Sequence, residues 1–227
     1  MSGRFLIASL LIVPLGATAA ESDTQRLDEC GTVLKEIMTA GDKAVPRDLF
    51  NKSYCAVVIP SMKKGGFIVS AKYGRGFASC RNPNGPGWTA PAAMRIEGGG
   101  FGLQIGGSAV DIVMLVMSER GMKGILASKF TLGGEASAAA GPVGRDATAQ
   151  TDATMRADIL SWSRSRGIFG GLSLQGGTLR ADSDVNKEIY GQKEANRDIL
   201  TGKVKSPGAA TGFLAALAKY GGTRRSK

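Results

Sequence analysis

The sequence lacks histidine entirely and has few cysteines and aromatic residues, and these absences exclude several kinds of site. Without histidine, the 227 residues cannot form a Ser-His-Asp or Cys-His catalytic arrangement or a histidine-ligated zinc site. The three cysteines, Cys30, Cys55 and Cys80, are too few for a tetrathiolate zinc site and too far apart for Cys-x-x-Cys chemistry. Aromatic residues, at 6%, are too sparse to form a stacking platform for single-stranded nucleic acid. We therefore expect no metal, no cofactor and no nucleic-acid partner.

Motifs of enzymes and nucleotide-binding proteins are also missing. The glycine-rich segment 98–107 lacks the Gly-Lys-Ser/Thr ending of a P-loop, and its glycines do not have the spacing of a dinucleotide fingerprint. Ser173 lies in Gly-Leu-Ser-Leu-Gln, which is not a nucleophile elbow. Acids such as Asp182 and Asp184 have no spacing specific to acid–base catalysis, and acids at helix starts are usually caps. We predict that the protein is not an enzyme.

Acidic residues are scarce compared with basic ones. The chain has 19 Asp and Glu against 29 Lys and Arg, which gives a formal net charge of +10. A basic surface attracts anionic partners such as lipid head groups, nucleic acid or acidic polymers, and it also favours solubility. Net charge alone does not choose among these roles.

The N-terminus has the pattern of a secretory signal. A short basic region at Met1–Arg4 precedes an apolar core at Phe5–Leu15, which is too short to span a bilayer. Small residues at 17–20 place cleavage near Ala19 or Ala20, and the alternative is an N-terminal membrane anchor. Acids directly precede Cys30, so we expect no lipid attachment there. The predicted organisation is a cleaved signal peptide at 1–20, one domain at 21–221 and a basic flexible tail at 222–227, in a periplasmic or secreted protein.

An exported compartment permits a disulfide. Three cysteines allow three pairings and leave one thiol over. Cys55 and Cys80 lie at the outer ends of a run of expected strands, which makes them the candidate pair. The alternative is that all three cysteines are small buried apolar residues.

Helices are expected at both ends of the chain, with glycine-punctuated strands between them. The fold class is therefore α+β, with a mainly antiparallel sheet or barrel-like core and peripheral helices at both ends. Asp111 opens a strand that is expected to be buried on both faces, and Ser118 is expected to cap a helix that runs through Ala127. The expected helices are Ser22–Ala40, a short helix after Pro46, Ser183–Tyr190, Gln192–Thr201 and Ala209–Tyr220. The expected strands are Cys55–Pro60, Gly66–Lys72, Gly76–Arg81, Trp88–Glu97, Val110–Met117, Thr131–Gly141, Arg156–Ser163 with Ile168–Gln175 as a hairpin, and Leu179–Asp182, which is expected to extend the sheet.

Basic residues recur in the expected turns, and turns at one end of a sheet can bring such residues together. A patch of this kind attracts anionic lipid, and exposed apolar residues beside it add interfacial insertion. The alternative is a set of scattered, solvated side chains. The candidate lipid-binding residues are Arg26, Lys35, Met62, Lys63, Lys64, Phe67, Lys72, Arg75, Arg81, Arg164 and Arg166.

Five segments between Cys55 and Tyr190, taken in order, resemble the SYLF domain family, also called the Ysc84-type actin-binding domain. They are Gly66-Phe67-Ile68-Val69 with Gly74-x-Gly76, Gly87-Trp88-Thr89-Ala90-Pro91, Asp111 opening an apolar strand, Leu132-Gly133-Gly134 through Gly141-Pro142-x-Gly144-Arg145, and Ser165-Arg166-Gly167-Ile168-Phe169-x-Gly171. The resemblance extends over about Leu27 to Tyr220. It implies a mostly β domain with peripheral helices that binds phosphoinositides and other lipids. Some eukaryotic members bind actin filaments, and in eukaryotic relatives an amphipathic segment matching Leu27–Ala40 contributes to membrane binding.

Together these observations predict a non-enzymatic domain of the bacterial cell envelope that binds anionic phospholipid or a phosphoinositide-type lipid and associates peripherally with a membrane. The alternative is a structural or interaction protein of the envelope that binds a protein or an acidic glycan through its basic face. Because the chain carries an export signal, actin is not expected as a physiological partner.

Overall fold

The computed structural model describes all residues except 1–21, 67–68, 102–105, 144–155, 166 and 223–227. The expected signal peptide at 1–20 lies outside the described residues. None of the helices in the described part of the chain has both the length and the apolar character needed to cross a membrane.

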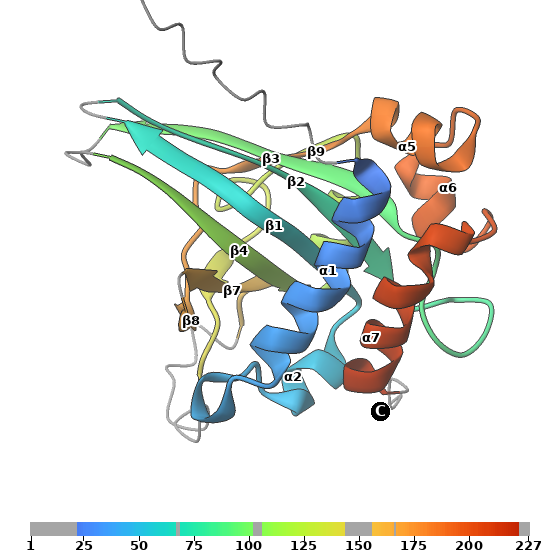
Figure 1. Cartoon of the computed structure of the whole chain (residues 1–227), viewed down its shortest axis with the longest axis horizontal. Coiled ribbons are helices and arrows are strands. Elements are labelled where there is room, and N and C mark those ends of the chain that lie inside the picture. The colour runs from blue at the N-terminus through green and yellow to red at the C-terminus, as the bar shows by residue number, and fades with distance from the viewer. Residues whose placement is uncertain (1–21, 67–68, 102–105, 144–155, 166, 223–227) are drawn as a thin grey trace, which may run out of the picture.

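A curled sheet forms the centre of the molecule (Figure 1). Its strands follow the order β5-β9-β3-β2-β1-β4-β7-β6, with β8 paired to β7, and every pairing is antiparallel except that of β6 with β7. The α+β class with helices at both ends of the chain is confirmed. The strands are β1 (Cys55–Gly66), β2 (Val69–Cys80), β3 (Ala92–Phe101), β4 (Gly106–Val116), β5 (Lys129–Thr131), β6 (Ala138–Ala140), β7 (Ile159–Ser165), β8 (Ile168–Gly171) and β9 (Thr178–Ala181).

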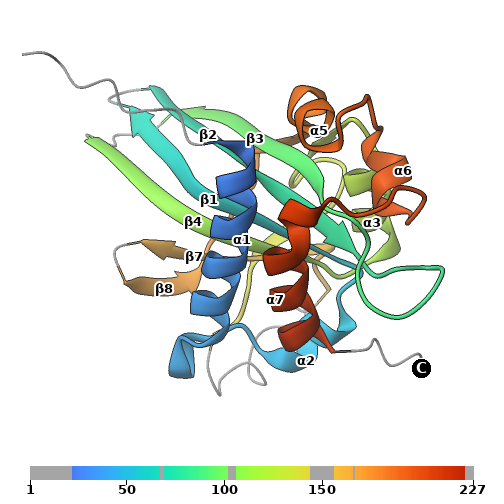
Figure 2. The ribbon, with the colours of Figure 1, turned by 45° about the vertical axis from the view of Figure 1, so that its right-hand side comes forward.

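The helices begin where the sequence predicts caps. Ser22 caps the first helix through a capping box with Gln25, and the Ser118 hydroxyl accepts a hydrogen bond from the Gly121 N–H at the third helix. The first and last long helices lie side by side on one face of the sheet (Figure 2). The helices are α1 (Asp23–Met38), α2 (Arg47–Lys52), α3 (Glu119–Leu126), α5 (Ser183–Tyr190), α6 (Asn196–Leu200) and α7 (Thr211–Gly221), with short 3-10 turns η1 (Gly41–Lys43) and η3 (Gly208–Ala210).

Both faces of the sheet carry a hydrophobic core. On the face covered by α1 and α7, Trp162, Phe50 and Phe213 are fully buried. On the opposite face, Ile59 and Met94 belong to a second buried cluster that includes residues of α3 and α6. Because β4 contributes alternate residues to both clusters, the prediction of a strand buried on both faces at Val110–Met117 is confirmed.

Strand β1 contains a bulge between Ile59 and Met62. Ser61 takes a positive φ of 47°, and its N–H donates to Asp111 Oδ1 at 2.9 Å. A Cβ added at Gly76 would lie 1.9 Å from the carbonyl oxygen of Val58, so the bulged strand comes too close to β2 for any side chain there. The bulge also changes which residues face α1: Val58 belongs to the helix-side core before it, whereas Met62 belongs to the opposite core after it.

The predicted division of residues 66–81 into two strands is wrong. Both pieces belong to β2, which runs without a turn through Tyr73-Gly74-Arg75. Lys63 and Lys64 likewise lie within β1 and not in a turn. The glycines that were predicted to form a turn here are sites of close contact between strands, since a Cβ at Gly74 would lie 2.7 Å from Ile59 Cγ2.

One further strand prediction is wrong. Residues 131–141 do not form one strand, because Gly133, with a φ of +84°, turns the chain between β5 and β6. Strand β9 extends the sheet as predicted, and it does so by pairing with β3 and β5. The β7–β8 hairpin itself is present, with Arg164 opposite Phe169.

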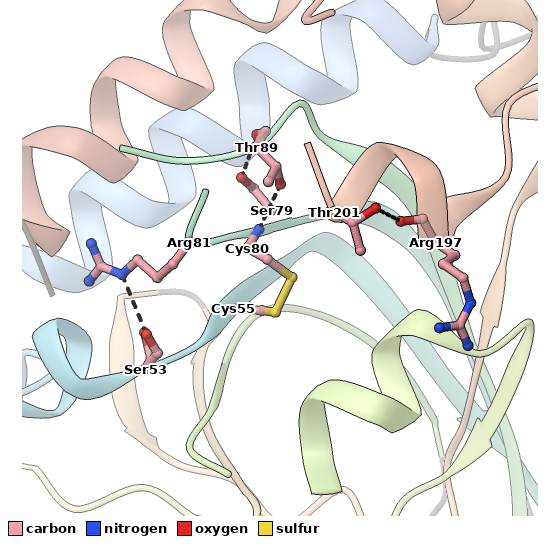
Figure 3. Close-up of a disulfide and its surroundings, with 8 residues drawn as sticks. All are labelled: Ser53, Cys55, Ser79, Cys80, Arg81, Thr89, Arg197 and Thr201. Carbon is pink, nitrogen blue, oxygen red and sulfur yellow. Dashed lines mark hydrogen bonds between the residues drawn. A yellow bond between two sulfur atoms is a disulfide. The ribbon is translucent and has the colours of Figure 1, made fainter. Parts of the chain in front are cut away.

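A disulfide joins Cys55 and Cys80, which are register partners at the start of β1 and the end of β2 (Figure 3). Beside it, the Cys80 N–H donates to the Thr89 hydroxyl at 3.1 Å, and the Ser79 hydroxyl donates to the Thr89 carbonyl at 2.7 Å. The buried thiol of Cys30 lies outside this disulfide and donates to the Val58 carbonyl.

Candidate anion-binding surface

The ends of β1–β4 extend past α1, and no helix lies over them (Figures 1 and 2). Lys64 pairs with Lys72 on one side and with Ser108 on the other, and Lys72 pairs with Gly98. The four residues therefore form one row across β3, β2, β1 and β4, with the side chains of Lys64, Lys72 and Ser108 on the face opposite α1.

Lys64 and Lys72 are half-buried in this row. Burial lowers the pKa of both ammonium groups, and the charge of Lys72 lowers the pKa of Lys64 further. The stem of Lys72 lies across Gly98, where an added Cβ would be 2.7 Å from Lys72 Cε, and Lys72 Nζ donates to the Gln175 carbonyl at 3.3 Å. Two cations held close together without a carboxylate favour the binding of an anion.

Lys63 lies in the next row, on the same face as α1, opposite Tyr73 and Ala109. Lys63 is exposed, and Tyr73 beside it is 44% exposed. No acidic residue occurs in the sequence at 62–74 or 98–110, so these strand ends have no carboxylate of their own. We call Lys63, Lys64 and Lys72 the lysine strand ends.

Two of the predicted arginines are held by carboxylates outside this site. Arg75 Nε lies 3.0 Å from Asp182 Oδ2. Arg164 makes ion pairs with Asp111 and with Glu36, which connects β7 to β4 and α1. Burial raises the pKa of Asp111, and the hydrogen bond from the Ser61 N–H opposes that rise. These contacts give both arginines a structural role.

Three further predicted cations lie away from the lysine strand ends. The Arg81 guanidinium lies 4.1 Å from the centre of the Trp88 ring and donates to the carbonyls of Phe50 and Gly221, so it joins α2 and α7 to the sheet. Arg26 pairs with Asp23 within α1. Lys35 is exposed on α1 and lines a groove of about 420 Å³ between α1 and α7.

The prediction for Met62 is wrong, because its side chain is 0% exposed and belongs to the core. The cause is the bulge in β1, which turns Met62 toward the face opposite α1. Phe67 and Arg166 lie outside the described residues. Ile168 at the start of β8 is 71% exposed and was missed as an apolar surface residue, although it directly follows the predicted hairpin turn.

Strands β1, β3 and β7 run in the same direction and therefore end on the same side of the sheet, where β2, β4 and β8 begin. The Ser165 hydroxyl donates to the Ala109 carbonyl, so the β7–β8 turn lies level with Lys63. Ile168 therefore lies at the same end of the molecule as the lysine strand ends. Among the residues that the structure describes, no cluster of three acidic or cysteine side chains could hold a metal ion.

Comparison with known proteins places the chain in a family. Residues 97–220 match the family model described as "Ysc84: Las17-binding protein actin regulator". The SH3 domain-containing YSC84-like protein 1 of Xenopus laevis is 34% identical over 182 residues, which cover 77% of this chain and 54% of that protein. Its human counterpart is 34% identical over 170 residues, covering 74% and 49%, and Protein YSC84 of Saccharomyces cerevisiae is 32% identical over 181 residues, covering 78% and 38%. The chain thus spans about half or less of the length of these relatives. Because the family model covers more than half of its residues, the chain belongs to the Ysc84, or SYLF, family.

Proposed function

We propose that the lysine strand ends bind the surface of an anionic membrane. The observation that carries this proposal is that three lysines, with no carboxylate beside them in the sequence, lie together on the paired strands β1 and β2, at an end of the sheet that no helix covers. A bilayer is a broad anionic surface, and lysine ammonium groups interact with it as mobile point charges without needing a shaped pocket.

The expected strength is modest. Each basic residue near an anionic membrane contributes about 1 kcal/mol, so three lysines contribute about 3 kcal/mol, or about 100-fold in affinity. Salt weakens this attraction because the Debye length shortens as ionic strength rises. The exposed Ile168 adds apolar contact at the same end.

Vesicle co-sedimentation tests the proposal. We expect the protein to bind phosphatidylglycerol vesicles at low salt, to bind phosphatidylcholine vesicles weakly, and to leave the anionic vesicles at high salt. The triple variant Lys63→Gln, Lys64→Gln, Lys72→Gln should lose about 100-fold in affinity.

The matched control removes three exposed lysines elsewhere: Lys52, Lys187 and Lys193, each changed to Gln. Both variants have the same net charge. If the control loses as much affinity as the triple variant, the binding reflects net charge alone and the proposed site is wrong.

The cellular location is part of the proposal. We propose that the N-terminal segment directs export, so that the mature protein acts in the periplasm or outside the cell. Mass spectrometry of protein recovered from an expressing bacterium should give a mature N-terminus near Ala19 or Ala20. An intact Met1 on the folded protein would contradict export by this signal. Because export separates the chain from the cytoplasm, we do not carry over the actin regulation named in the family description.

A further inference from the structure

Four cationic residues form a second row across the sheet, and only Arg75 among them was a predicted binding residue. Arg75 on β2 lies opposite Arg95 on β3, Arg95 lies opposite Arg180 on β9, and Arg180 lies opposite Lys129 on β5. Adjacent strands are about 4.8 Å apart, so neighbouring side chains in the row are close. Like charges in direct cross-strand contact repel, which makes this arrangement costly unless other groups compensate.

Two carboxylates compensate part of the charge and orient the arginines. Glu97 lies 2.8 Å from Arg95 Nε and 3.1 Å from Arg180 Nε. Asp182, whose side chain is 1% exposed, lies 3.0 Å from Arg75 Nε and 3.9 Å from Arg95 Nη1. Four cations and two carboxylates leave the row with an excess of positive charge. We call Arg75, Arg95 and Arg180 the arginine row.

The carboxylates lie closest to the Nε atoms of the arginines, as ion pairs without hydrogen-bond geometry, and the outer donors stay available. Among the described residues, no hydrogen bond uses a terminal Nη atom of Arg95 or Arg180. Their side chains are 31% and 37% exposed. The guanidinium groups are therefore positioned from below by the protein while their outer edges face solvent, and such edges suit bidentate pairing with an oxyanion.

The surroundings favour a protein partner over a small molecule. Small ligands bind in concave sites, and the two grooves found at α6 and between α1 and α7 are lined by other residues. Tyr73 lies two residues along β2 from Arg75 on the same face and is 44% exposed. Arginine and tyrosine are enriched among the residues that contribute most to protein–protein affinity.

We propose that the arginine row and Tyr73 form a docking surface for an acidic segment of a protein, whose Asp and Glu side chains pair with the outer edges of the guanidinium groups. This surface differs from the lysine strand ends and borders them only at Lys63, which lies opposite Tyr73 on the same face of the sheet. Lys64 and Lys72 face the opposite side of the sheet, and the arginine row uses β3, β9 and β5.

Fluorescence anisotropy with a labelled oligo-glutamate peptide tests the proposal, with an oligo-glutamine peptide of equal length as the control probe. The full chain should bind oligo-glutamate in a salt-sensitive manner and should not bind oligo-glutamine. Arg180→Gln should lower the affinity at least about tenfold, since a hydrogen bond to a charged group contributes about 1.5–3 kcal/mol. Arg180→Gln leaves both ion pairs of the buried Asp182 in place, so the variant should remain folded.

The control variant Lys193→Gln removes one exposed positive charge elsewhere and should change the affinity less than twofold. Amide NMR spectra of the unmodified chain provide a second measurement, in which oligo-glutamate should shift the signals of Tyr73, Glu97 and Arg180. The proposal is overturned if Arg180→Gln binds the peptide like the unmodified chain, if Lys193→Gln loses as much affinity, or if the shifted signals lie elsewhere.

A vesicle-binding measurement on the same variant distinguishes this proposal from the membrane proposal. Arg180→Gln should bind phosphatidylglycerol vesicles as the unmodified chain does. If Arg180→Gln instead loses vesicle binding and keeps peptide binding, the arginine row belongs to a membrane surface and the docking proposal is wrong. Failure of the lysine triple variant to lose vesicle binding would overturn only the membrane proposal.

Discussion

The lysine strand ends and the arginine row are two basic regions of the same sheet, and the protein holds them in different ways. Lys63, Lys64 and Lys72 have no carboxylate nearby in the sequence, and two of them are partly desolvated. Arg95 and Arg180 are each fixed by carboxylates at one edge of the guanidinium group. Mobile point charges suit a diffuse anionic surface, whereas fixed planar groups suit carboxylates at defined positions. We therefore propose different anionic partners for two regions that contribute alike to the net charge.

The largest loss of stability should come from disrupting the bulge in β1, which decides on which side of the sheet Lys63 and Lys64 project. Gly76→Ala would place a Cβ 1.9 Å from the Val58 carbonyl oxygen and would force β1 and β2 apart at the bulge. We expect a loss of more than about 3 kcal/mol in the free energy of unfolding. Thermal unfolding followed by circular dichroism measures it. Gly85→Ala, where nothing lies within 4 Å, is the control and should unfold near the original temperature. A normal melting temperature for Gly76→Ala would contradict the proposed role of the bulge.

The next largest change in stability should distinguish the two carboxylates that pair with the arginine row, Asp182 and Glu97. Asp182→Asn removes the charge of a buried group between Arg75 and Arg95, and we expect a loss of about 2 kcal/mol in unfolding free energy. Glu97→Gln removes a more exposed charge and should cost less than about 1 kcal/mol. Urea unfolding of both variants measures the difference. Equal losses would show that burial of Asp182 does not strengthen its ion pairs.

Exchanging the two kinds of cation tests the comparison directly. Arg95→Lys keeps the charge but loses the planar fork, so oligo-glutamate affinity should fall about tenfold, or about 1.4 kcal/mol. The triple variant Lys63→Arg, Lys64→Arg, Lys72→Arg keeps all three charges, and its affinity for anionic vesicles should change by less than about twofold. Anisotropy and co-sedimentation provide the two affinities. If both exchanges have the same effect, the distinction between the two regions fails.

The smallest effect is the dependence on pH. The pKa values of Lys64 and Lys72 are lowered from the ordinary 10.5, so these lysines lose charge as pH rises toward that value. As pH rises, vesicle affinity should therefore fall severalfold before pH 10.5 is reached. Arginines keep their charge to above about pH 12, and oligo-glutamate binding should stay constant over the same range. A parallel loss of both activities would indicate a general change in the protein.

Much of the fold could be predicted from the sequence because local signals and tertiary structure agree. The Ser22 and Ser118 caps, the β7–β8 hairpin and the doubly buried β4 follow from cap chemistry, turn residues and hydrophobic runs. The errors at residues 66–81 have one cause. Glycines at 74 and 76 have the same appearance in a sequence whether they make a turn or allow two strands to approach closely.

The two basic regions also differ in how far they could be predicted from the sequence. The three lysines of the strand ends were all among the eleven predicted lipid-binding residues, because basic residues recur along this part of the sequence. The arginine row was missed because β3 and β9, which carry Arg95 and Arg180, are far apart along the chain and pair only in the folded sheet. Met62 was placed on the surface because a bulge, which reverses the alternation of inward and outward side chains, leaves no clear pattern in the sequence.

The Cys55–Cys80 disulfide has a consequence for the opposite end of the sheet. It ties the register partners at the base of β1 and β2, so neither strand can slide along the other by one position while the covalent link is intact. Such a slide would swap the sides on which Lys63 and Lys64 project and would separate Lys64 from Lys72. The covalent link at the base thus keeps the charge pattern at the far end aligned.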